Sequence, residues 1–128
     1  MRQIPKNVQR LLKRLNKSEK EIAEYCIDHA TEILKENGYE DSRMWATTIL
    51  SSLLPDLDFM ESEEDLQIWL LELDELEQDV AEAILNTFSY LKKSLRRAKH
   101  TDILDTLKYS ISKVLNELEK EKYYKSYG

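Results

Sequence analysis

Apolar residues recur at every third or fourth position through most of this sequence, the spacing that places side chains on one face of an α-helix. The first run follows Pro5, and its apolar residues are Val8, Leu11, Leu12 and Leu15. The second run opens with Ser18 and Glu21, a capping-box pair, and ends at Asn37-Gly38, a common helix stop. Its apolar stripe consists of Ile22, Cys26, Ala30 and Ile33. The pattern therefore predicts two amphipathic helices before residue 40.

A third run ends before Pro55, and its predicted buried face consists of Trp45, Ile49, Leu50 and Leu53. Ser62 and Asp65 then repeat the capping-box chemistry. From there the apolar residues continue, without a Gly or Pro, through positions 66, 69, 73, 76, 80, 83, 84, 88, 91 and 95. This run predicts one long fourth helix of about 35 residues, or two helices on one axis, with any bend in the polar segment 74–79.

A last run follows Thr101, a suitable cap, and its apolar residues are Leu104, Leu107, Ile111, Val114 and Leu118. The apolar period is then lost, so residues 121–128 are expected to fray. Because the chain holds only two Gly and two Pro and no sustained alternating stretch, we expect no sheet. The sequence predicts an all-α fold: a compact bundle of four to five amphipathic helices with a long fourth helix, forming one domain over residues 1–128.

The long fourth helix predicts self-association. At 1.5 Å per residue it would span about 50 Å, which exceeds the diameter of a domain of this size. The other predicted helices are too short to cover all of its apolar seam. A two-fold contact between identical chains is the commonest way to cover such a surface. We therefore expect a homodimer.

Cysteine content and hydropathy indicate the compartment. Cys26 is the only cysteine, so no intrachain disulfide forms, and the N-terminal residues do not resemble a secretory leader. The longest unbroken apolar run is Ile68–Leu71, far shorter than the roughly 20 residues of a membrane span. These features predict a cytoplasmic protein that does not bind membranes.

The net charge is −6, but the charges are unevenly distributed. Residues 1–20 carry seven basic groups and one acidic group, and residues 81–100 carry five basic groups and one acidic group. Residues 61–80 carry nine acidic groups and no basic group. Such blocks either pair with each other inside the bundle or form separate basic and acidic surfaces, and the sequence leaves both possibilities open.

Six potential cations crowd the end of the fourth run: Lys92, Lys93, Arg96, Arg97, Lys99 and His100. This block is the predicted site for a nucleic acid or another anionic partner, because clustered cations attract phosphates. The alternative is structural, since cations near a helix C-terminus are stabilised by its dipole or pair with a neighbouring acidic helix. An acidic stripe offers a similar choice between a surface for a basic partner and a solvated helix face; it consists of Glu61, Glu64, Glu72, Glu75, Asp79 and Glu82.

The stretch L-x-x-SEKEIAEYCIDHATEIL, residues 15–34, resembles the start of the N-terminal helix-turn-helix domain of RpiR-type sugar-responsive regulators. The shared features are a Leu, a Ser-Glu pair, an Ile-Ala, a Tyr and a later Leu at matching spacing. The resemblance implies the opening of a DNA-binding fold. That family continues through a tight turn into a recognition helix, and residues 35–55 contain neither the turn nor a basic recognition face. No base-reading residue is therefore carried over.

Motifs for catalysis and metal binding are missing from the sequence. Cys26 and His29 are three positions apart, but a zinc site needs further ligands, and His100 is the only other histidine. No phosphate loop, nucleophile triad or Glu-x-x-His pair occurs. We therefore predict no enzyme, cofactor, metal site or small-molecule substrate. The leading expectation is protein–protein interaction, as an adaptor, a regulator or a subunit of a larger assembly; the alternative is a nucleic-acid-binding regulator that uses the basic N-terminal segment and the block Lys92–His100.

Overall fold

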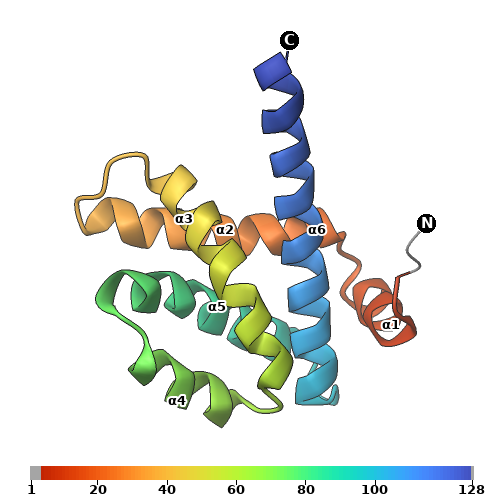
Figure 1. Cartoon of the computed structure of the whole chain (residues 1–128). Coiled ribbons are helices and arrows are strands. Elements are labelled where there is room, and N and C mark those ends of the chain that lie inside the picture. The colour runs from red at the N-terminus through yellow and green to blue at the C-terminus, as the bar shows by residue number, and fades with distance from the viewer. Residues whose placement is uncertain (1–3, 128) are drawn as a thin grey trace.

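A computed structural model describes residues 4–127 of the chain, with side chains described through residue 121. Within that part all regular structure is helical, which confirms the predicted all-α class (Figure 1). The elements are α1 (Lys6–Leu15), α2 (Glu19–Glu36), α3 (Ser42–Leu53), the short 3-10 helix η1 (Leu54–Phe59), α4 (Glu63–Glu72), α5 (Glu75–Ser94) and α6 (His100–Tyr127). None of the helices described combines the length and the apolar character needed to cross a membrane.

The prediction of one long fourth helix is wrong, because this part of the chain forms two helices, α4 and α5. The backbone turns at Leu73 and Asp74, which adopt extended conformations with ψ of 154° and 170°. Asp74 then caps α5, since its Oδ1 accepts the backbone N–H of Glu77 at 2.9 Å. Figure 1 shows α5 running back over α4, so the predicted shared axis is wrong as well. The turn falls at the start of the polar segment 74–79, where the sequence placed any bend.

Packing explains why the chain turns back at this point. The hairpin lets Leu70, Leu73 and Leu76 pack at the edge of the core. Gln78 Nε2 also donates a hydrogen bond to the carbonyl oxygen of Leu70 at 3.1 Å, which ties α5 to α4. The continuous seam that predicted a homodimer does not form. The homodimer itself is untested and stays a prediction, now without this support.

The centre of the bundle consists of α2, α5 and α6, with α2 packed against both of the others. Because it is enclosed on two sides, α2 buries a wider face than predicted, which also includes Ala23, Ile27 and Leu34. Three hydroxyl side chains in this core each donate to the carbonyl oxygen four residues earlier; they are Thr87, Thr106 and Ser110. These bonds satisfy buried polar atoms within their own helices, so burial of the hydroxyls costs little.

The two tryptophans differ in burial. Trp69 packs in the core with 8% of its surface exposed, and its Nε1 donates to Asp56 Oδ2 at 3.0 Å, which confirms the prediction for this residue. Trp45 is 42% exposed, so the predicted buried face of α3 is wrong at this position. Ala46 faces inward instead, because α3 packs directly on α2 and a small side chain fits that contact. The rest of the predicted face is buried: Ile49, Leu50 and Leu53.

The predicted caps at Ser18 and Ser62 form, whereas the predicted cap at Thr101 is wrong, because α6 begins at His100 and Thr101 lies inside its first turn. The hydroxyls of Ser18 and Ser62 each accept a backbone N–H at 3.2 Å from the third residue onward. Gly38, at the end of α2, has φ of 85°, the left-handed conformation that glycine adopts without strain. The expected fraying of residues 121–128 falls almost entirely outside the residues whose side chains are described, and it stays a prediction.

Candidate interaction surfaces

The predicted basic block, Lys92–His100, straddles the end of α5 and the start of α6. Two members lie in the last turn of α5 and one begins α6; the other three lie in the connecting turn and are Arg96, Arg97 and Lys99. Buried Leu95 anchors this turn, and the N–H of Ala98 donates to its carbonyl oxygen at 3.0 Å. The block is therefore presented by a helix end and a turn rather than by one helix face.

Members of this block have different surroundings. Lys92 Nζ lies 2.8 Å from Glu63 Oε2 on α4, the structural pairing that was the alternative prediction. The ring of His100 meets the ring of Phe88 edge-on, with centroids 5.6 Å apart. Four members are exposed and form no ion pair with any side chain that the structure describes; they are Lys93, Arg96, Arg97 and Lys99. These four carry the charge that the block presents to solvent.

The basic N-terminal segment lies next to the same turn. Asn7 Nδ2 donates to Asp102 Oδ1 at 3.0 Å and to Asp105 Oδ2 at 2.9 Å, which fixes α1 against the first turns of α6. Arg10 Nη2 forms an ion pair with Asp102 at 3.3 Å. Figure 1 shows α1 beside the half of α6 that follows the α5–α6 turn. The fold thus brings together two basic segments whose relative position the sequence does not give.

A second surface, which the sequence analysis missed, consists of exposed apolar side chains on η1 and α4. The exposed fraction is 87% for Phe59, 59% for Ile68 and 78% for Leu71. Phe59 and Ile68 line a pocket of about 400 Å³, and Leu71 lies one helical turn beyond Ile68. We call this pocket with its three exposed apolar side chains the apolar hollow. Its other lining residues are Asp56, Met60, Asp65, Trp69 and Glu72.

Helical geometry explains why these apolar residues face outward. Leu66 and Trp69 are the buried residues of α4 and define its inward face. At 100° per residue, Ile68 and Leu71 fall on the opposite side of the helix. The signal in the sequence was the unbroken run Ile68–Leu71, because a helix with one buried face cannot bury four consecutive residues.

Carboxylates surround the apolar hollow. Asp56, Asp65 and Glu72 line it, and exposed Glu64 lies one helical turn before Ile68. No Lys or Arg occurs between residues 61 and 80. The turn at Leu73–Asp74 divides the predicted acidic stripe, so that its first half belongs to this surface and its second half to α5. The hollow is therefore lined by both apolar side chains and carboxylates.

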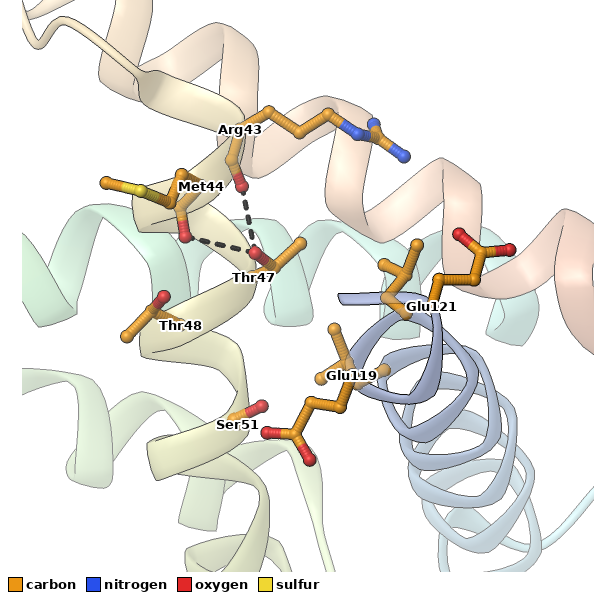
Figure 2. Close-up of a pocket in the computed structure, with 9 residues that line it drawn as sticks. Arg43, Met44, Thr47, Thr48, Ser51, Glu119 and Glu121 are labelled. Atoms are coloured by element: carbon orange, nitrogen blue, oxygen red, sulfur yellow. Dashed lines mark hydrogen bonds between the residues drawn. The ribbon is translucent and has the colours of Figure 1, made fainter. Parts of the chain in front are cut away.

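A larger pocket of about 490 Å³ separates α3 from the distal part of α6 (Figure 2). The hydroxyl of Thr47 donates to carbonyl oxygens of its own helix, at 3.1 Å from Arg43 and 3.0 Å from Met44. Figure 2 shows Ser51 of α3 and Glu119 of α6 pointing toward each other across the pocket. The remaining lining residues are Thr48, Leu115, Leu118 and Glu121. Side chains of two helices, α3 and α6, thus line this pocket.

Cys26 is an unreactive thiol in this fold. Burial raises the pKa of the Cys26 thiol to about 12, and a hydrogen bond with Thr87 offsets only part of that rise. The thiol is therefore protonated at neutral pH, and the protonated form is a poor nucleophile and a poor metal ligand. His29, its neighbour in the sequence pattern, has its Nδ1 2.9 Å from the carbonyl oxygen of Tyr25. Among the described residues, His, Cys, Asp and Glu side chains form no group of three that could hold a metal ion.

The pKa values of two carboxyl groups at the start of α5 are shifted in opposite directions. Hydrogen bonds from the backbone, above all the N–H of Glu77, hold the pKa of Asp74 below its usual range. The side-chain hydrogen bond with Asp74 raises the pKa of Glu77, and the negative charge of Asp74 adds to the effect. Asp74 therefore keeps its charge, and its role as a cap, to lower pH than an ordinary aspartate.

Comparison of the chain with models of protein families, with curated proteins and with solved structures gives no match. The local resemblance of residues 15–34 to RpiR-type regulators is thus not extended by any of these comparisons. In the structure those residues form the end of α1 and most of α2. The surfaces of the folded protein are therefore the basis for a functional proposal.

Proposed function

We propose that this protein is a helical interaction module that binds another protein, as an adaptor, a regulator or a subunit of a larger assembly. The observation that supports the proposal is the apolar hollow, where exposed Phe59 and Ile68 line one pocket and exposed Leu71 lies one helical turn beyond Ile68. Single exposed apolar residues are common on soluble proteins, but large apolar side chains that gather around a pocket are typical of a binding site.

The partner that this surface fits is an amphipathic helix with basic flanks. An apolar groove accepts the apolar stripe of a helix through side chains spaced three or four residues apart. The carboxylates that line the hollow are those of Asp56, Asp65 and Glu72, and their negative charge favours Lys and Arg on the flanks of that helix. Charge complementarity of this kind speeds association and selects among partners more than it adds affinity.

We further propose that the protein acts in the cytoplasm and that it binds its partner without catalysing a reaction. The raised pKa of the Cys26 thiol, about 12, supports this view, because the most nucleophilic side-chain type in the chain is held protonated inside the core. A buried, free cysteine also suits a reducing compartment. No cofactor, metal or small-molecule substrate is part of the proposed function.

The test uses the whole chain as an affinity bait in three forms: wild type, a hollow variant and a control variant. The hollow variant is Phe59→Ser with Leu71→Ser, and the control is Tyr39→Ser with Met44→Ser, two exposed residues outside the hollow. Phe59 and Leu71 are 87% and 78% exposed, so the hollow variant should melt close to the wild-type temperature. Tyr39 and Met44 are 38% and 46% exposed, so the control should lose some stability and is used at a temperature where circular dichroism shows it folded. We expect a protein that wild type and control retain and the hollow variant loses. The retained protein must then bind through a basic amphipathic segment. This is shown if the purified segment binds the wild type and if the Kd of the segment for the hollow variant is at least about tenfold higher.

Two results would count against this proposal. Equal retention of every partner by the hollow variant would show that the exposed apolar residues are not the binding site. A wild-type dimer in light scattering that the hollow variant dissociates would show that a second copy of this chain occupies the hollow. In that case the proposal of a basic helical partner would be wrong.

A further inference from the structure

We propose that α1 and the α5–α6 turn together form a surface that binds the phosphate backbone of nucleic acid without reading its bases. We call it the basic surface; its exposed cations are Lys6, Lys13, Arg14, Lys93, Arg96, Arg97 and Lys99. This is the alternative function predicted from the sequence, which required both basic segments to lie together. It is independent of the proposed function, because the apolar hollow is formed by other elements.

The first step is the position of α1 relative to the turn. Asn7 and Arg10 hold α1 to Asp102, at distances of 3.0 and 3.3 Å. Asp102 lies only three residues after Lys99, within the first turn of α6. This end of α1 is thus next to the C-terminal end of the α5–α6 turn.

The second step concerns the other end of α1. Lys17 Nζ, two residues beyond the end of α1, lies 5.9 Å from the centroid of the Tyr90 ring on α5. Lys93 follows Tyr90 by three residues and therefore projects from the same side of α5. Residues of α1, and Lys17 just beyond it, thus contact the elements that flank the turn, so the two basic segments are neighbours in the fold.

The third step is that nearby carboxylates are already neutralised. Glu19 binds Lys113 at 3.6 Å, and Glu21 binds Lys17 at 3.8 Å. Asp105 accepts a hydrogen bond from Asn7 and lies 3.6 Å from Lys108. The seven cations of the basic surface, by contrast, form no ion pair with any described side chain. Clustered cations of this kind bind polyanions by releasing the counterions that surround the phosphates.

The composition of the surface favours nucleic acid over an acidic protein. A protein interface has an apolar centre, and the large apolar side chains that are exposed among residues 4–121 belong to α3, η1, α4 and the loop before α3. The aromatic rings nearest the basic surface, Tyr25 and Tyr90, stack on each other with centroids 4.5 Å apart. Their facing sides are therefore occupied, which leaves phosphate contacts as the main interaction and predicts little sequence preference.

Fluorescence anisotropy with labelled duplex DNA and single-stranded RNA of mixed sequence tests this proposal. Two variants each remove two cations, Arg96→Ser with Arg97→Ser in the turn and Lys13→Ser with Arg14→Ser in α1. Lys92 stays unchanged because it pairs with Glu63. The matched control, Lys35→Ser with Lys120→Ser, makes the same change in charge at exposed lysines of α2 and of the distal part of α6, which form no ion pair with any described side chain.

We expect both basic-surface variants to weaken binding at least about tenfold at 0.1 M salt, while the control stays within about twofold of wild type. Across about 50 to 200 mM salt, loss of two phosphate contacts should reduce the slope of log K against log salt by about 1.8 for the duplex and about 1.4 for a single strand. The affinities measured for the two probes show which form of nucleic acid is bound more tightly. The hollow variant should bind nucleic acid as the wild type does, which separates this proposal from the proposed function.

Three outcomes would overturn the inference. One is no measurable binding to either nucleic acid at low salt, with all variants folded by circular dichroism. Another is an equal loss of affinity in the control, because net charge alone would then explain binding. The third is equally tight binding to polyglutamate or to phosphatidylserine vesicles, which would show that the surface attracts anions of any kind.

Discussion

The two tryptophans provide the sharpest test of the helix registers. Trp69→Ala removes a side chain that is 8% exposed, whereas Trp45→Ala removes one that is 42% exposed. The two substitutions are chemically identical, so the difference between them depends on burial. If the structure is right, Trp69→Ala lowers the free energy of unfolding clearly more than Trp45→Ala.

The expected magnitudes follow from buried area. A buried Trp removes on the order of 200 Å² from water. At about 25 cal/mol per Å², the burial of Trp69 stabilises the fold by about 4–5 kcal/mol, and a compact denatured state reduces this to roughly 3–4 kcal/mol. The same reasoning gives about 2 kcal/mol for Trp45. The hydrogen bond from Trp69 to Asp56 adds little, since exposed Asp56 regains a water molecule when the indole is removed.

Urea denaturation followed by far-ultraviolet circular dichroism measures both values, and the helical signal does not depend on the tryptophan that is removed. Equal losses in the two variants, or a larger loss for Trp45→Ala, would refute the assigned register of α3 or α4. A stability unchanged from wild type in Trp69→Ala would refute the packing of α4 on the core.

Three further predictions concern other parts of the fold. Glu77→Gln should raise the melting temperature at neutral pH. The pKa of Glu77 is raised in the folded protein, so the stability of the wild type falls as pH rises through that pKa. The advantage of the variant should vanish below both the folded and the unfolded pKa, and its persistence there would contradict the pairing of Glu77 with Asp74. Cys26 should react with a thiol reagent only at the rate of unfolding, since its pKa is about 12; rapid labelling of the native protein would show that the site is open. Asn7→Ala should cost about 1–2 kcal/mol and speed hydrogen exchange in α1 more than in α2, whereas equal protection would mean that other contacts hold α1.

Two helix starts were predictable because capping is local. Ser18 and Ser62 each accept an N–H from the third residue onward, and all the atoms involved lie within one turn of sequence. Asp74 has the same chemistry, but an aspartate inside an apolar period also fits an exposed helix position. Only the packing of Leu73 and Leu76 against the rest of the core decides that the helix ends there, and such long-range contacts are not encoded in periodicity.

The register of α3 shows a similar limit. The spacing of its apolar residues is compatible with burial of either Trp45 or Ala46 beside Ile49 and Leu50. Hydrophobicity alone favours the tryptophan. The close approach of α3 to α2 favours the smaller side chain, and the distance between two helices cannot be read from either sequence segment.

The candidate surfaces were partly predictable for the same reason. The cluster of cations from Lys92 to His100 is visible in the sequence, but the pairing of Lys92 with Glu63 depends on the α4–α5 hairpin. The neighbourhood of α1 and the α5–α6 turn depends on contacts between residues almost a whole chain apart. The apolar hollow was detectable from the run Ile68–Leu71, had the inward face of α4 been assigned from Leu66 and Trp69.

The attachment of α1 to α6 has a consequence for the order of folding. Asn7 and Asp105 are separated by 98 positions, so their contact closes a loop that spans all the other helices. During synthesis, α1 leaves the ribosome before the other described helices, and its hydrogen-bond partners on α6 follow only after α2 to α5. The helix α1 therefore docks late, and a chain that stops short of α6 carries a basic amphipathic helix with its apolar face uncovered. Native packing of α1 is thus a sign that synthesis has continued into α6.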